Sequence, residues 1–294
     1  MKLAAFSFQS EHHIGVIQGE NAISLTLLGE DLFPKCLKTF IEKSDELLPL
    51  AGRLIEQNEN RDAVFPVSEV KILPPIPTPE KIICVGLNYI DHCRETGMEP
   101  PASPVIFSKY ANAIVGHNDA VEIPINSNEV DFEAELAVVI GKEAKWISEE
   151  EAEEYVFGYT IMNDISARDL QFKDGQWSRG KTADTFAPTG PLIVTKEEAG
   201  DPHNLAISLE LNGEVMQNSN TSNLIFSVPQ IISFLSQSMT LKPGDIIATG
   251  TPPGVGMGRT PKVWLKDGDR MSITIENIGT LSNYVIANSQ KEGC

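Results

Sequence analysis

The stretch Asp131-Phe132-Glu133-Ala134-Glu135-Leu136-Ala137-Val138-Val139-Ile140-Gly141 starts acidic, ends apolar and is the most informative segment of the chain. Side chains of a strand alternate between its two faces, so Glu133 and Glu135 share one face. The strand then becomes wholly apolar, which predicts that it enters the interior. Two carboxylates at the mouth of a buried strand repel each other and lose hydration, so a positive group is expected to compensate them. An exposed strand end with solvated glutamates fits the pattern equally well.

A second strand-like run, at residues 157–163, leads to a third carboxylate, Asp164, in an apolar setting. Three carboxylates without a cluster of cysteine or histidine favour a hard, oxygen-preferring cation such as Mg²⁺ or Mn²⁺. Zn²⁺ would be expected to recruit histidine or cysteine ligands, which this spacing does not offer. The alternatives for Asp164 are a cap at the end of the strand or an ion pair with Arg168.

A histidine and a glutamate follow another strand-like run, at residues 81–85. His92 and Glu95 are three positions apart and are therefore neighbours on a helical turn. A carboxylate so placed orients the imidazole and raises its basicity, as the activation of water requires. The glycine and prolines within residues 97–104 predict an irregular, mobile segment suited to a lid. A chance pairing of histidine and glutamate is the alternative.

Most of the chain after residue 79 is typical of strands joined by tight turns. Residues 212–213, Asn-Gly, predict a two-residue hairpin because both turn positions favour positive φ, and residues 266–269 predict a second turn of that kind. Residues 148–151 form a capping-box pattern and residues 227–237 begin with serine and an early proline, so two short helices are expected. The strands are too closely spaced for regular βαβ units, which excludes a Rossmann or barrel fold. A mixed, rolled β-structure is expected.

A run of prolines at residues 74–79 enforces extended chain and marks a seam. Before the seam, the apolar pattern predicts short strands at residues 3–8 and 13–18 and a helix at residues 37–57. We expect a small N-terminal domain of residues 1–73, which serves packing or dimerisation, and a catalytic domain of residues 74–294.

The net charge of the 294-residue chain limits its partners. It is −18, from 23 basic and 41 acidic residues. A chain that acidic repels polyphosphate and anionic lipid, so neither nucleic acid nor a membrane surface is an expected partner. No segment approaches the roughly 18 consecutive apolar residues that a membrane span needs. If the substrate is an anion, a bound metal ion would overcome the negative field locally.

The four cysteines, Cys36, Cys84, Cys93 and Cys294, show no CxxC pair. Their spacing favours reduced thiols and a cytoplasmic location. Cys93 follows His92 directly, but adjacent side chains usually point apart, which disfavours a catalytic cysteine–histidine pair.

Two glycine-rich stretches, at residues 180–182 and 250–256, do not match a phosphate loop. The backbone amides and hydroxyl at Thr251, with Lys181 as a point charge, are suited instead to a small carboxylate. Nucleotide binding is therefore disfavoured.

Taken in order, five motifs resemble the fumarylacetoacetate hydrolase superfamily and cover residues 77–286. The motifs are residues 86–95, Glu133-Ala134-Glu135, residues 163–171, Gly180-Lys181-Thr182 and residues 244–252. The resemblance implies an α+β, mainly β fold, with a mixed β-roll or β-sandwich C-terminal domain and a small N-terminal α/β appendage. It also implies a homodimer and one Mg²⁺ or Mn²⁺ ion per chain.

The resemblance further implies a role for nine side chains. They are Glu133, Glu135 and Asp164 for the metal; His92, Glu95 and Lys181 for catalysis; and Arg168, Gln171 and Thr251 for contact with the substrate. His92 and Glu95 would lie on a closing lid, and Lys181 would lie near the metal.

One departure from the family pattern narrows the expected substrate. Fumarylacetoacetase has a further metal-binding aspartate several residues before its catalytic histidine, whereas the only carboxylate within residues 81–91 here is Asp91, directly beside His92. The chain is therefore more similar to the branch that contains acylpyruvases, oxaloacetate decarboxylases and hydroxyheptadienedioate isomerases. The implied substrate is a small anionic 2-oxo acid.

We expect a metal-dependent hydrolase that cleaves a carbon–carbon bond in acylpyruvate-type 2,4-dioxo acids, with water activated by His92 and Glu95. Oxaloacetate decarboxylation or tautomerisation, or isomerisation of 2-hydroxyhepta-2,4-diene-1,7-dioate, would use the same site. A non-catalytic protein that binds a 2-oxo acid is a further alternative.

Overall fold

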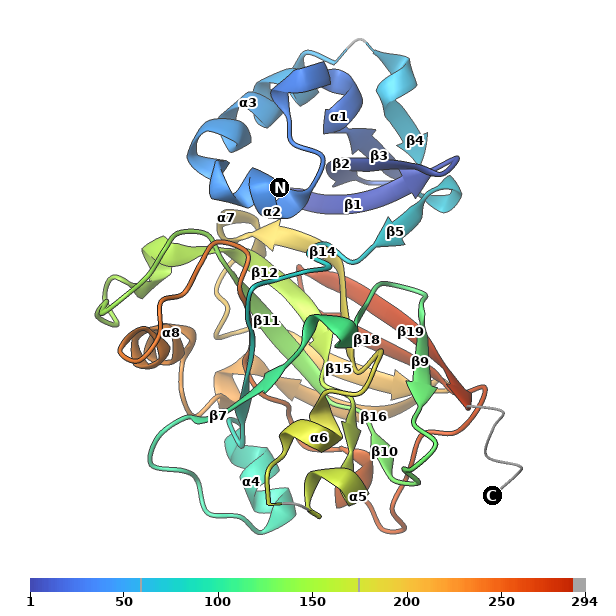
Figure 1. Cartoon of the computed structure of the whole chain (residues 1–294), viewed down its shortest axis with the longest axis vertical. Helices are drawn as coiled ribbons and strands as arrows, with labels where there is room; N and C mark the ends of the chain where they lie inside the picture. The colour runs from blue at the N-terminus through green and yellow to red at the C-terminus, as the bar shows by residue number, and fades with distance from the viewer. Residues whose placement is uncertain (59, 174, 288–294) are drawn as a thin grey trace.

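Strands dominate the computed structural model, which describes residues 1–58, 60–173 and 175–287 (Figure 1). Twelve of the described strands form one mixed sheet: β1 (Lys2–Phe8), β2 (Glu11–Gln18), β3 (Asn21–Ser24), β4 (Val64–Pro66), β5 (Lys71–Leu73), β6 (Ile82–Gly86), β7 (Val105–Lys109), β8 (Ile114–Val115), β11 (Ala134–Ile140), β12 (Val156–Asn163), β14 (Ala187–Thr195) and β17 (Ile246–Ala248). The main path is β4-β3-β2-β1-β14-β12-β11-β17-β6-β7, while β5 pairs with β1 and β8 with β14.

A second sheet packs against the centre of the first. In the described chain it has five strands: β9 (Ala120–Ile123), β15 (Ala206–Leu211), β16 (Glu214–Asn220), β18 (Arg270–Ile275) and β19 (Gly279–Ala287). Its order is β16-β15-β18-β19-β9, and it contacts β11, β12 and β14 of the first sheet. A short antiparallel pair, β10 (Val130–Asp131) and β13 (Ser166–Ala167), forms a separate two-stranded sheet. The expected α+β, mainly β fold is confirmed.

The described helices are short and lie between the strands. They are α1 (Leu25–Leu28), α2 (Leu37–Glu42), α3 (Ser44–Glu56), α4 (Ile90–Thr96), α5 (Arg168–Gln171), α6 (Ser178–Lys181), α7 (Lys196–Ala199) and α8 (Val228–Ser236). Single turns of 3-10 helix add η1 (Glu30–Leu32), η2 (Arg61–Ala63), η3 (Val67–Glu69), η4 (Ala111–Ala113), η5 (Ala152–Tyr155), η6 (Thr221–Asn223) and η7 (Gly256–Gly258). No described helix is long and apolar enough to cross a membrane.

Several local predictions are confirmed. The Asn212-Gly213 turn joins β15 to β16, with φ of 54° and 83° at its two residues. Helix α8 begins with the expected cap, because the Ser227 hydroxyl accepts from the amide of Gln230 and the Gln230 side chain accepts from the amide of Ser227. A turn at residues 267–268 precedes β18 as expected.

Two helix predictions are wrong in detail. The helix expected at residues 37–57 is two helices, α2 and α3, separated by non-helical backbone at Lys43 (φ −117°, ψ 23°). The capping-box pattern at residues 148–151 leads only to the 3-10 turn η5. One half of the box forms there, since the Glu151 carboxylate accepts from the amide of Ser148 at 2.9 Å, but the backbone turns into β12 after Tyr155.

Strand β11 lies at the centre of the first sheet, between β12 and β17, and all of its residues are buried. Its antiparallel register sets Ala134 opposite Asn163 and Glu135 opposite Met162. The amide of Asp164 also donates to the carbonyl of Glu133 at 2.9 Å. The register therefore brings the acidic start of one strand to the acidic end of the other.

The N-terminal elements continue the large sheet rather than forming a sheet of their own. Lys2 and Leu3 of β1 pair with Val194 and Ile193 of β14. Figure 1 shows β1–β4 and α1–α3 gathered at one end of the molecule, with the site-bearing strands β11 and β12 beyond β14. The division into domains of residues 1–73 and 74–294 stays a prediction.

Candidate active site

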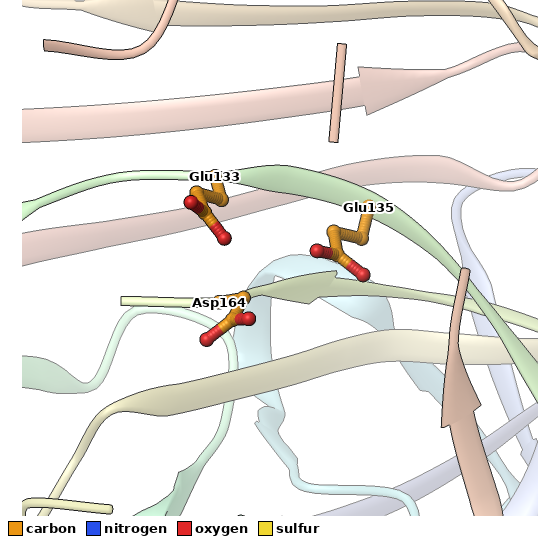
Figure 2. A group of neighbouring side chains, drawn as sticks. All are labelled: Glu133, Glu135 and Asp164. Atoms are coloured by element: carbon orange, nitrogen blue, oxygen red, sulfur yellow. The ribbon is translucent and has the colours of Figure 1, made fainter. Parts of the chain in front are cut away.

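Three carboxylates converge where β11 begins and β12 ends. Oxygens of Glu133, Glu135 and Asp164 all lie within 4.8 Å of one another. Figure 2 shows the two glutamates extending from neighbouring positions of one segment towards Asp164. Their exposed fractions are 6%, 2% and 0%, which excludes the solvated strand end. Burying three like charges together requires compensation by positive groups.

Three cations surround the cluster but reach only two of its members. Lys181 Nζ lies 2.8 Å from Glu133 Oε2 and 2.9 Å from Asp164 Oδ2. Arg168 Nη2 lies 2.6 Å from Glu133 Oε1, and Lys109 Nζ lies 2.7 Å from Asp164 Oδ1. The expected alternative partner of Asp164, Arg168, instead contacts Glu133. Asp164 is thus paired with two lysines.

The pKa values of the two glutamates move in opposite directions for this reason. Burial alone would raise the pKa of Glu133, but the charges of Lys181 and Arg168 hold it well below its usual range. Burial, reinforced by the charges of Asp164 and Glu133, raises the pKa of Glu135 well above its usual range. Within the described residues, the hydrogen bond that the Glu135 carboxylate accepts comes from the amide of Gly250, at 2.8 Å. Glu135 is therefore the carboxylate that gains most from an added cation.

The donor set fits a divalent metal ion. Asp164 Oδ1 is fully buried and receives no hydrogen bond from the described residues, although Lys109 lies beside it as an ion pair. Three carboxylates without thiolate or imidazole are the ligands that Mg²⁺ and Mn²⁺ prefer. A cation bound among the three carboxylates would contact Asp164 and would also compensate Glu135, which no described cation contacts directly.

The His92–Glu95 pair forms as predicted. Both residues lie on α4, and His92 Nδ1 is 3.1 Å from Glu95 Oε2. The other oxygen of Glu95 accepts the amide of Gly254 at 2.9 Å, so the same carboxylate also ties α4 to a glycine-rich loop. Because Nδ1 donates to the carboxylate, Nε2 is the basic nitrogen of the imidazole.

One cavity gathers most of the predicted site residues. Its polar lining comprises His92, Glu133, Glu135, Arg168, Gln171, Lys181 and Thr251. The remaining two predicted residues lie behind this lining: Asp164 beneath Lys181, and Glu95 behind His92. Apolar side chains complete the lining of the cavity, among them Met98, Trp177 and Met257. The nine residues are thus brought together, and their individual roles stay predictions.

The three predicted substrate contacts are held by side-chain hydrogen bonds. Arg168 Nη1 donates to Gln171 Oε1 at 3.0 Å, because the short helix α5 sets these two residues one turn apart. Thr251 Oγ1 accepts from Gln217 Nε2 at 2.8 Å. All three side chains are at least nine-tenths buried, so they are already oriented towards the cavity.

Sequence reasoning missed two charged residues of this site. Lys109 ends β7 and is fully buried, and strand alternation places it on the same face as Phe107. Asp131 lies two positions before Glu133 and is also fully buried. The two-residue alternation that placed Glu133 and Glu135 on one face could also have pointed to Asp131. No feature of the sequence shows which groups the buried face of Lys109 contacts.

Replacing Lys109 with methionine is expected to lower the free energy of unfolding of the metal-free protein by about 3 kcal/mol or more. Its ammonium donates to the backbone carbonyls of Ile165, Lys181 and Phe186 at 2.6–2.9 Å, and these would lose their donor together with the counter-charge of Asp164. Urea unfolding followed by fluorescence measures the change.

The matched control is Lys71→Met. Lys71 pairs with Asp119 at 3.0 Å, but 61% of its side chain is exposed, so its loss should cost less than about 1 kcal/mol. Equal stability losses for the two variants would contradict the structural role of Lys109.

The described cysteines do not join the site as a catalytic pair. Cys36 and Cys84 are free thiols, and Cys93 Sγ lies 3.6 Å from the carbonyl of Leu87, whereas His92 Nδ1 contacts Glu95. Burial raises the pKa of the Cys93 thiol, which opposes thiolate formation. Cys294 lies outside the described residues.

The chain is similar to known proteins along nearly its whole length. Residues 81–286 match the family model of the C-terminal part of fumarylacetoacetate (FAA) hydrolase. The chain is 46% identical over 286 residues to a Bos taurus protein named oxaloacetate tautomerase FAHD2A, mitochondrial, and the alignment covers 95% of this chain and 90% of the relative.

Two solved structures extend the comparison. The 2-hydroxyhepta-2,4-diene-1,7-dioate isomerase from Mycobacterium marinum is 37% identical with a TM-score of 0.77, over 98% of this chain and 99% of that one. The maleylpyruvate hydrolase from Sphingobium sp. SYK-6, in complex with manganese(II) and pyruvate, is 31% identical with a TM-score of 0.81, over 98% and 100% of the two chains.

The protein therefore belongs to the fumarylacetoacetate hydrolase family, as its motifs indicated, and it is an enzyme of that family. Within the family it is similar to proteins named as oxaloacetate tautomerases and as a dienedioate isomerase.

Proposed function

We propose that this enzyme uses Mg²⁺ or Mn²⁺ to interconvert the keto and enol forms of oxaloacetate or a closely similar 2-oxo acid. The observation that carries the proposal is one cavity that joins the buried cluster of Glu133, Glu135 and Asp164 to the His92–Glu95 pair. The identity to the bovine oxaloacetate tautomerase supports the substrate. The manganese(II) and pyruvate in the related hydrolase support both the metal and the 2-oxo acid.

Tautomerisation requires the transfer of one proton from C3 to the keto oxygen. A bound divalent ion would polarise the keto oxygen and the adjacent carboxylate of a 2-oxo acid and acidify the C3 proton. His92, oriented by Glu95, is the base that removes this proton at Nε2. Lys181 and Arg168 supply positive charge and N–H donors where negative charge develops on oxygen.

The hydrolysis of acylpyruvates is the second candidate, and the same His92–Glu95 pair favours it. His92 would deprotonate water rather than C3, hydroxide would attack the C4 carbonyl, and the C3–C4 bond would break with pyruvate enolate as the leaving group. Decarboxylation of oxaloacetate needs neither step, because carbon dioxide leaves from C4 directly. The dienedioate isomerase reaction is again a proton transfer, which His92 would serve.

The remaining features of the proposal concern the setting of the site. We propose a homodimer, by analogy with the family, and a cytoplasmic location, which the free thiols of Cys36 and Cys84 favour. The relatives' names include a mitochondrial protein, so fractionation of the native host is the direct test of location. The affinity of the protein for Mg²⁺ and for Mn²⁺, each measured separately, would show which ion it prefers.

The test is a set of rates on purified protein stripped with EDTA and then reloaded with Mg²⁺ or Mn²⁺. We expect enol-oxaloacetate to convert to the keto form rapidly in the loaded enzyme and at the background rate in the stripped one, as followed by loss of enol absorbance. Parallel assays of acetylpyruvate and of pyruvate release from oxaloacetate separate hydrolysis and decarboxylation. A rate that EDTA leaves unchanged, or no rate on any 2-oxo acid, would overturn the proposal.

A further inference from the structure

Asp131 is a further buried carboxylate, two residues before Glu133, and it lies outside the cluster of Glu133, Glu135 and Asp164. It is fully buried at the end of β10. Its Oδ2 accepts from Arg168 Nε at 2.9 Å and faces Arg168 Nη2 at 2.8 Å. A buried carboxylate that receives the fork of a guanidinium fixes both the position and the plane of that group.

The contacts of Arg168 divide its guanidinium into two edges. The Nε–Nη2 edge faces Asp131, with Nη2 also 2.6 Å from Glu133, and Nη1 points to Gln171 at the cavity. Without Asp131, the charge of Arg168 would be balanced by Glu133 alone. Asp131 therefore shares with Glu133 the compensation of the Arg168 charge.

Asp131 also holds a second segment that lines the cavity. Its oxygens accept the amides of Gly256 at 2.7 Å and Met257 at 3.0 Å, at the start of η7. A Cβ on Gly256 would lie 2.7 Å from Asp131 Oδ1 and 1.9 Å from the carbonyl of Val263, so no side chain fits there. The Asp131 carboxylate thus connects the guanidinium of Arg168 to the loop that contributes Met257 to the cavity.

We propose that Asp131 is a positioning residue for the 2-oxo acid. Asp131 holds the guanidinium of Arg168 so that Nη1 is directed to the substrate carboxylate, and it fixes the Gly256–Met257 turn through the two backbone amides. Asp131 itself touches neither substrate nor metal. This inference rests on the proposed function, because it assigns the carboxylate of the proposed 2-oxo-acid substrate to Arg168.

The test compares Asp131→Asn with wild type, both loaded with Mn²⁺. Asparagine keeps the shape but loses the charge, and its amide presents a donor to the donors of Arg168 or the turn. We expect KM for oxaloacetate to rise at least tenfold and the affinity for pyruvate, measured by calorimetry, to fall by a similar factor. The affinity for Mn²⁺ should change less than about threefold, since Asp131 is not in the cluster.

A double-mutant cycle separates positioning from general support of the fold. In the Arg168→Met background, Asp131→Asn should change pyruvate affinity less than twofold, because the residue through which it acts is absent. Full additivity of the two substitutions would overturn the proposal. Asp131→Glu, which keeps the charge on a longer arm, should give an intermediate pyruvate affinity and serves the same test where the asparagine variant does not fold.

Asp169→Asn is the matched control. Asp169 is the next residue after Arg168 and accepts from Ser127 Oγ at 2.7 Å and the Asn128 amide at 2.9 Å, away from the cavity. Its replacement should leave KM and pyruvate affinity unchanged. Wild-type protein that neither binds pyruvate nor turns over oxaloacetate would refute the proposed function, whereas functional wild type with an unaffected Asp131→Asn variant would refute this inference alone.

Discussion

Replacing Glu135 with alanine is expected to abolish measurable Mn²⁺ binding and to lower turnover of oxaloacetate by at least about 10³-fold, equivalent to roughly 4 kcal/mol of transition-state stabilisation. Glu135 is the member of the cluster that no described cation contacts directly, so its charge is the least committed to the protein. Glu133 and Asp164 both contact Lys181, so their charges would remain compensated in the Glu135→Ala protein. Calorimetry against Mn²⁺ and steady-state rates on the same preparation measure both effects.

Glu143→Ala is the control for this variant. Glu143 is an exposed carboxylate that pairs with Lys242 and does not belong to the cluster, so its loss removes one negative charge without removing a ligand. Mn²⁺ affinity and turnover should both be retained. An unchanged Mn²⁺ affinity in the Glu135→Ala protein would show that the metal, if bound, uses other ligands.

The loss of the His92 imidazole should separate reactions that need a base from one that does not. In His92→Ala, tautomerisation of oxaloacetate and hydrolysis of acetylpyruvate should each fall by about 10² to 10⁴, the usual contribution of general-base catalysis. Decarboxylation of oxaloacetate should be largely spared, because the C3–C4 bond breaks without removal of a proton. Steady-state kinetics with saturating Mn²⁺ on both substrates give the comparison.

Glu95→Gln should affect the same reactions more weakly, because the imidazole remains while the carboxylate that orients its Nδ1 is neutralised. The amide can still accept from Gly254, so the attachment of α4 to the loop is preserved. Equal losses in all three reactions for His92→Ala would mean that His92 shapes the cavity rather than transferring a proton.

The centre of the site was predictable because it depends on local periodicity. Alternation along one strand placed Glu133 and Glu135 on a common face, and the register of β11 with β12 then added Asp164. Helical spacing similarly predicted the contact between His92 and Glu95. Each of these inferences needs one element, or two adjacent ones, so few competing arrangements existed.

The parts that the sequence did not reveal depend on packing between distant segments. The ammonium of Lys109 meets carbonyls more than fifty residues further along the chain, which no spacing rule connects. The fork between Asp131 and Arg168 likewise joins segments 37 residues apart, which the pairing of β10 with β13 holds side by side. At residues 148–151, half of a capping box formed without a helix, since the demands of β12 prevailed over a local preference.

The pairing of β1 with β14 has a practical meaning for anyone who wishes to isolate the family-matching part of this protein. A chain cut at the proline run would remove β1 from its place beside Ile193 and Val194 of β14, which would then keep only β12, on the other side, as a neighbour in the main path of the sheet. Those residues are fully buried, so the cut would also uncover apolar surface along a newly open edge. Such a fragment would be prone to self-association and aggregation through this edge. The proline run therefore marks a change in the sequence pattern, but the sheet continues across it, and it is a poor place to truncate the protein.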